Sequence, residues 1–147
     1  MNVFLLTGLL CLVALGCSNK FNLQDIVGTV TIDGQPAAEA GVVFVALDPD
    51  GRDCGGRTDE NGVFTMTSSV GKGGDGTSPG KYKVYFEKMV PAKDLPTDDP
   101  RRTKAAIESD MYFNNLPERY RIENEKAEFE VEVVKGKNNF TFDLKSK

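Results

Sequence analysis

Residues Ile26–Leu47 read IVGTVTIDGQPAAEAGVVFVAL, and this stretch decides the fold class of the chain. From Ile26 to Ile32 every second residue shares one face, which is the period of a half-buried strand. The DG pair that follows is a strong turn signal, and a proline prolongs the break. The chain resumes at Gly41 with the run VVFV, which is apolar on both faces and predicts a central strand.

Two further stretches carry strand and turn signals. Thr58–Phe64 reads TDENGVF, in which Gly62 suits a positive φ, and the alternation beyond it places Phe64 inward. This pattern predicts a hairpin with a buried phenylalanine. Lys81–Lys88 alternates too, and it predicts a strand with Tyr82, Val84 and Phe86 inward and Tyr85 outward.

The C-terminal segment predicts a last pair of strands. Glu128–Val134 alternates apolar residues with three glutamates, a GKN turn follows, and alternating Phe140, Phe142 and Leu144 come next. We expect a hairpin here. Short alternating strands without a long helix in the body predict an all-β fold, an antiparallel β-sandwich.

The composition limits the function classes. The chain has 147 residues, a net charge of −4 and basic residues interleaved with acidic ones, so we expect no nucleic-acid partner. It contains no histidine, the commonest general base and metal ligand. The adjacent carboxylates Asp98 and Asp99 lie in a polar stretch where solvation is the rule. We therefore expect no catalytic residues, no metal and no cofactor.

The N-terminus predicts a membrane anchor. Val3–Cys17 is uncharged and apolar, too short to span a bilayer and suited to a signal peptide. Its end, ALGC at residues 14–17, resembles the lipobox of bacterial lipoproteins, although alanine stands where leucine is usual. That resemblance implies lipidation of Cys17, which ends the signal-peptide region 1–17 and becomes the first mature residue after cleavage. An ordinary signal peptide remains the alternative.

Anchoring would place the protein in the bacterial cell envelope. Several acyl chains hold a protein stably at a membrane. Ser18 in place of aspartate favours the outer membrane. Residues 18–25 would form a polar tether, and residues 26–147 one domain. Cys11 would leave with the signal peptide, so Cys54 would be alone and is expected in the core; without lipidation, a Cys17–Cys54 bridge becomes available.

Two loops invite ligand hypotheses that their spacing does not support. Asp48–Asp53 carries three aspartates but lacks the glycine and glutamate positions of a calcium-binding EF-hand loop, so a solvated turn is expected. Val70–Gly80 is rich in glycine but is followed by a strand rather than a helix, which excludes a phosphate-binding P-loop. We interpret it as a flexible connection.

Pro91–Lys126 is long, polar and irregular. Asp99 and Pro100 suit the start of a short helix over residues 101–109. An aromatic cluster follows, and it either packs over an open end of the sandwich or forms a ligand or partner patch of Tyr112, Phe113 and Tyr120.

The order of these motifs resembles a known family. GTVTIDGQP at 28–36, GVVF at 41–44, TDENGVF at 58–64, PGKYKV at 79–84, LPERY at 116–120 and KGKNNFTFDL at 135–144 are similar to carboxypeptidase regulatory-like (transthyretin-like) domains, above all the small lipoproteins of planctomycete bacteria. The resemblance departs at Arg121–Lys126. It implies a seven-stranded transthyretin-like sandwich without catalytic machinery.

The resemblance also bears on activity. A related group that hydrolyses 5-hydroxyisourate uses histidines and a C-terminal YRGS, whereas this chain has no histidine and ends LKSK. The function expected is that of a non-enzymatic, membrane-anchored lipoprotein serving structure or protein interaction. The alternative is a small-ligand or carbohydrate-binding module that uses the three aromatic residues.

Overall fold

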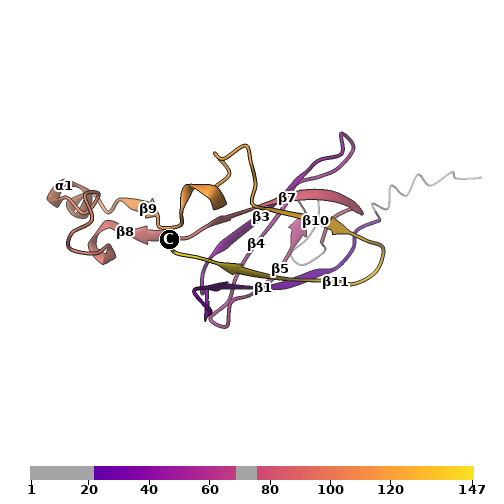
Figure 1. Cartoon of the computed structure of the whole chain (residues 1–147), viewed down its shortest axis with the longest axis horizontal. Coiled ribbons are helices and arrows are strands. Elements are labelled where there is room, and N and C mark those ends of the chain that lie inside the picture. The colour runs from indigo at the N-terminus through magenta and orange to yellow at the C-terminus, as the bar shows by residue number, and fades with distance from the viewer. Residues whose placement is uncertain (1–21, 69–75) are drawn as a thin grey trace, which may run out of the picture.

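The protein consists of a β body from which an elongated arm projects (Figure 1). The computed structural model describes residues 22–68 and 76–147. The predicted signal peptide with Cys11 and Cys17, the start of the tether and most of the glycine-rich connection lie outside the described residues, so those expectations stay predictions.

The first sheet is built around the opening strand. β1 (Ile26–Ile32) pairs antiparallel with β2 (Gln35–Pro36) and β5 (Val63–Thr65), and parallel with β11 (Asn138–Leu144). Every residue of β1 has a register partner in β11, from Ile26 opposite Asn138 to Ile32 opposite Leu144. The all-β prediction is confirmed, but a fully antiparallel arrangement is wrong for this pair.

The second sheet is antiparallel throughout. Its five strands follow the order β10 (Phe129–Val133), β7 (Gly80–Glu87), β3 (Gly41–Ala46), β4 (Cys54–Arg57) and β6 (Thr67–Ser68). The apolar strand β3 lies in the middle, as its two apolar faces predict.

The two sheets enclose one aromatic core. Phe44 of β3 is fully buried, and its ring packs against Phe64, Phe140 and Phe142 of the first sheet at centroid distances of 6.5, 5.7 and 6.3 Å. Such aromatic pairs contribute about 0.5–1.5 kcal/mol each beyond the burial of their area. The inward residues predicted for β7, Tyr82, Val84 and Phe86, are buried in the same core.

The predicted hairpins are wrong, because the turns connect strands of different sheets. β4 and β5 flank the turn at Gly62, whose φ is +74°, yet β4 pairs with β3 while β5 pairs with β1. Likewise β10 pairs with β7 and β11 with β1. Each turn therefore carries the chain from one sheet to the other and does not join two paired strands.

The outward orientation predicted for Tyr85 in β7 is correct, but this residue is buried rather than exposed to solvent. Tyr85 points to the outer face of the second sheet, yet only 5% of it is exposed. Ile122 and Glu123 lie beside it around a small cavity of about 130 Å³ that Val43 also lines. The segment after the arm thus covers part of a face that strand alternation assigns to solvent.

The arm is more regular than the sequence predicts. β8 (Met89–Pro91) pairs antiparallel with β9 (Tyr112–Asn114), and the short helices η1 (Ala92–Asp94) and α1 (Lys104–Glu108) lie between them. The predicted helix exists but starts later, since Thr103 rather than Asp99 caps it by accepting a hydrogen bond from the Ala106 N–H.

The arm and the first described residues lie at opposite ends of the molecule (Figure 1). The helix η2 (Glu118–Tyr120) returns the chain from the arm to the body. The C-terminus lies near the base of the arm, where the Lys145 N–H donates to the Tyr120 hydroxyl at 2.9 Å. The parallel β1–β11 pair therefore runs along the body from the first described residues toward the arm.

Candidate functional site

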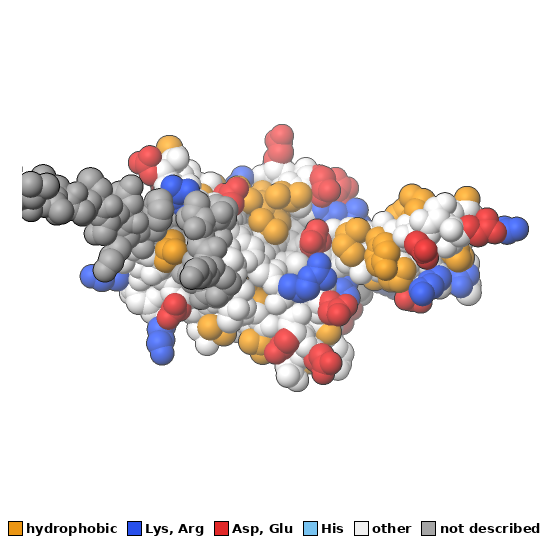
Figure 2. Space-filling model, turned by 180° about the vertical axis from the view of Figure 1, so that it is seen from behind, with side chains coloured by type: hydrophobic (Ala, Val, Ile, Leu, Met, Phe, Trp, Pro, Cys, Tyr) orange, Lys and Arg blue, Asp and Glu red, His pale blue; other side chains and the backbone are white. Residues whose placement is uncertain are grey.

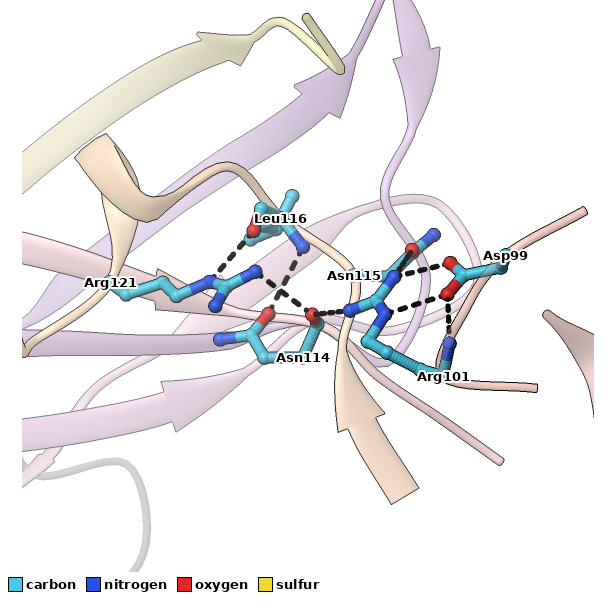
Figure 3. Close-up of polar contacts among 6 residues, drawn as sticks. All are labelled: Asp99, Arg101, Asn114, Asn115, Leu116 and Arg121. Atoms are coloured by element: carbon cyan, nitrogen blue, oxygen red, sulfur yellow. Dashed lines mark hydrogen bonds and ion pairs between the residues drawn. The ribbon is translucent and has the colours of Figure 1, made fainter. Parts of the chain in front are cut away.

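Two arginine side chains converge on one backbone carbonyl at the base of the arm (Figure 3). Arg101, between η1 and α1, donates from Nη1 to the Asn114 oxygen at 3.0 Å. Arg121, just beyond η2, donates from Nη2 to the same oxygen at 3.1 Å. The end of β9 is thus held from the arm side and from the body side at once.

Arg101 is itself held by a bidentate ion pair. Its Nη2 lies 2.7 Å from Asp99 Oδ2 and its Nε 3.0 Å from Oδ1, the fork geometry that charge-assisted pairs favour. Hydrogen bonds from the Arg101 side chain and backbone lower the pKa of Asp99 to about 2. The guanidinium also lies over the Phe113 ring, 5.7 Å from its centroid.

The Asn114 side chain completes the junction. Its Oδ1 accepts from the backbone N–H groups of Lys88 and Leu116, both at 3.1 Å, while Arg121 Nε donates to the Leu116 oxygen at 2.8 Å. Lys88 also donates from Nζ to the Ala38 carbonyl in the body. Both strands of the arm are therefore fixed to the body where they leave it.

The arm carries a group of exposed apolar side chains. Tyr112 is 58% exposed, Met111 47% and Met89 42%. Pro91 lies opposite Tyr112 in the β8–β9 register. Figure 2 shows hydrophobic side chains gathered on the arm and at its junction with the body. We call Met89, Pro91 and Tyr112 the arm patch, because alternation in the β8–β9 pair places these three side chains on one face.

The three aromatic residues predicted as a patch do not share a surface. Tyr112 lies in the arm patch, and Phe113 is half-buried beside Arg101. Tyr120 is only 2% exposed and packs in the core against Phe86 and Phe129. Tyr120 thus fits the packing interpretation, since it closes the body at the end that carries the arm.

Neither the two arginines nor Asn114 is predicted from the sequence. Their partners are mostly backbone carbonyls and distant residues, which no local motif encodes. Only the Asp99-x-Arg101 spacing offered a signal, and we interpreted that aspartate as a helix cap instead.

A hollow of about 500 Å³ lies at the opposite end of the body. Residues from β1, β5, β11 and the adjoining turns line it, and they include Asp25, Val27, Thr65, Lys137 and Asn139. Its described lining contains no aromatic ring, so the arm aromatics and this hollow are separate features.

The remaining chemical candidates have structural roles. Cys54 is buried at 5% exposure, as predicted, and burial raises the pKa of its thiol to about 12. In the aspartate-rich turn, Asp53 accepts from the Ala46 N–H at 2.8 Å and Asp48 from the Lys81 N–H at 3.3 Å. Across residues 22–68 and 76–147, no three histidine, cysteine, aspartate or glutamate residues are placed to hold a metal ion.

Comparison with known proteins gives no relative: no protein-family model, curated protein or solved structure matches this chain. Within the described part of the chain, no helix combines the length and apolar character that crossing a membrane requires.

Proposed function

We propose that this protein is a non-enzymatic lipoprotein of the bacterial cell envelope, anchored through Cys17, whose β body presents the arm as a protein-interaction surface. The observation that carries the proposal is the arm patch on a rigidly held projection: Tyr112 is 58% exposed while Arg101 and Arg121 fix the strand that carries it. The ALGC pattern at residues 14–17 supports the anchoring part.

The form of the arm suits binding to another protein. Tyrosine and methionine are enriched at the centres of protein interfaces. A surface that is already ordered loses less conformational entropy when it binds. The junction at Asn114 supplies that order, because its hydrogen bonds engage both strands of the arm before any partner arrives.

The family assignment belongs to the same proposal. We propose a carboxypeptidase regulatory-like domain with a seven-stranded, transthyretin-like arrangement, and the two-sheet aromatic core around Phe44 supports it. The absence of catalysis is supported by the use of the charged groups at the junction, since Asp99, Arg101 and Arg121 all bind backbone or one another. Placement at the outer membrane follows from Ser18.

The anchor is tested by metabolic labelling with an alkyne analogue of palmitate, followed by mass spectrometry of the mature N-terminus. We expect label on the wild type with Cys17 as the first residue, and none on Cys17→Ala. Equal labelling of the two chains, or cleavage at another residue, would show that anchoring through Cys17 is wrong.

The arm is tested by cross-linking the full chain in membranes and comparing what is captured. Tyr112→Ser removes the most exposed ring of the arm patch, and Val134→Ser, at 51% exposure beyond β10, is the matched control. We expect the cross-linked partner proteins to disappear with Tyr112→Ser and to remain with Val134→Ser. Identical capture profiles for the two variants would contradict the role of the arm.

A further inference from the structure

β11 ends its sheet with an open outer edge. Within residues 22–68 and 76–147 its only strand partner is β1. The Asn138 N–H donates to the backbone oxygen of Asp25 at 3.0 Å, and the Leu144 backbone oxygen accepts from the Asp33 N–H at 2.9 Å. The backbone groups of the even-numbered residues of β11 therefore point toward β1. The backbone groups of Asn139, Thr141 and Asp143 therefore point away from the sheet. An edge of this kind is a template for another strand.

The second sheet also ends in a strand, but its charges oppose self-pairing. Glu130 and Glu132 of β10 are exposed, and like charges opposite each other destabilise a strand pair. β11 differs, because Asn139 and Thr141 are neutral. Lys137 precedes the strand, and Asp143 lies near its end, where it pairs with Lys145 of the same chain at 2.6 Å and still exposes half of its side chain. Charge thus opposes self-pairing at the β10 edge, whereas the β11 edge can still pair with another strand.

We propose that β11 pairs antiparallel with β11 of a second copy of this chain, about a two-fold axis at Phe140. In this register Asn139 lies opposite Thr141 of the second copy, and both residues direct their backbone groups to the shared edge. Lys137 lies opposite Asp143 of the second copy, and symmetry repeats this pair of opposite charges. The self-complementarity of the strand identifies a second copy as the occupant.

The register with its axis at Thr141 is less favourable, and the register with its axis at Asn139 loses the Lys137–Asp143 pair because it places Lys137 opposite Thr141. An axis at Thr141 would place Lys137 opposite Lys145 of the second copy, with two like-charge contacts in place of two attractive ones. The dimer proposed joins two first sheets into one continuous sheet. It is independent of the proposed function, because neither Cys17 nor the arm patch takes part.

Sedimentation of the purified full chain in detergent measures the dimer. We expect a concentration-dependent dimer whose dissociation constant rises roughly tenfold or more in Lys137→Glu, since two attractive pairs become repulsive. The double variant Lys137→Glu/Asp143→Lys restores two attractive pairs and should recover part of the loss, although it also removes the Asp143–Lys145 ion pair within each chain. Lys126→Glu makes the same change of charge on an exposed loop residue and should leave the constant unchanged.

Disulfide trapping measures the register. A tagged Asn139→Cys chain is mixed with an untagged Thr141→Cys chain, and we expect the mixed cross-link to exceed both like-with-like cross-links and the wild-type background. A chain that is monomeric at all concentrations, a dimer insensitive to Lys137→Glu, a dominant Thr141–Thr141 cross-link, or a different protein bound at this edge would each overturn the proposal.

Discussion

The carbonyl oxygen of Asn114 illustrates how single residues set the form of this protein. A carbonyl has two lone pairs, and here Arg101 and Arg121 use both. The two arginines are far apart in sequence and lie on different sides of the arm's base (Figure 3). Sequence analysis identified neither, because a backbone acceptor leaves no trace in the residue type. The buried Cys54, by contrast, was predictable from its isolation and small size.

The first prediction concerns the pH dependence of the Asp99–Arg101 pair. The folded pKa of Asp99, about 2, is below its ordinary value of 3.8, so the ionised form stabilises the fold. That contribution is complete above pH 3.8 and is lost as the pH falls toward 2. Asp99→Asn should therefore lower the melting temperature at neutral pH, and the difference from wild type should shrink through this window.

Thermal unfolding of both chains across a pH series makes the measurement. Asp98→Asn, one residue away and exposed, is the matched control and should show no such convergence. A difference for Asp99→Asn that stays constant down to pH 2 would mean that the carboxylate charge does not stabilise the arm.

The second prediction concerns Arg121. Its guanidinium reaches the Leu116 and Asn114 oxygens at 2.8 and 3.1 Å, a fork that an ammonium group does not reproduce. Arg121→Lys and Arg121→Ala should both lower the free energy of unfolding, by about 1–3 kcal/mol. Hydrogen exchange should accelerate first at residues 111–116. Arg102→Ala, which loses bonds to Lys93 within the arm only, should leave that junction protected.

At the scale of elements, alternation predicted the faces of strands but not their partners. The inward residues of β1, β5, β7 and β11 are correct, because a period of two reports burial directly. The predicted hairpins failed because β1 takes as its longest partner β11, at the other end of the chain. The outward direction of Tyr85 is also correct, but its burial was not predicted, since Ile122 and Glu123 lie beside it on the outer face of the sheet. The alternation of apolar and polar residues reports neither which strands pair nor which outer faces other segments cover.

The two strands of the arm were not predicted because they are short. β8 and β9 have three residues each, fewer than any periodic pattern needs. Its order comes instead from the ladder between Val90 and Phe113 and from the charged junction at its base. The sequence predicted that a helix forms here but not where it starts. Asp99 binds Arg101, and Thr103 caps the helix instead.

The third prediction tests the packing of β1 against its two neighbouring strands, β5 and β11. A Cβ added at Gly28 of β1 would lie 2.5 Å from the Phe64 ring and 2.6 Å from the Phe140 oxygen. Gly28→Ala should therefore cost about 1–3 kcal/mol by overpacking. Gly55 of β4 is the matched control, because its added Cβ would only touch the Val42 oxygen at 3.6 Å. Urea unfolding of both variants compares the costs, and equal costs would contradict the packing described.

At the scale of the whole molecule, the fold separates two surfaces. The arm patch lies at one end, whereas the edge of β11 runs along the side of the body (Figure 1). A dimer through β11 would therefore leave both arms free, and its antiparallel symmetry would direct them to opposite ends. Two of the anchors proposed at Cys17 would hold such a dimer at a membrane more firmly than one, because the second anchor binds at high effective concentration.

The fourth prediction follows from this geometry and rests on the proposed dimer. Spin labels at position 139 of two paired copies should lie close together, because adjacent strands are only about 4.7–4.9 Å apart. Labels at Tyr112, on the arms, should lie much farther apart, since the two-fold axis places the arms at opposite ends. Dipolar broadening of the continuous-wave spectrum measures the short distance and pulsed electron resonance the long one, both on the full chain in detergent. A side-by-side parallel pairing would bring the arms together, so a short distance at Tyr112 would exclude the antiparallel arrangement. Lys137→Glu should weaken the dipolar signal at both positions alike, because it acts on association and not on the arm.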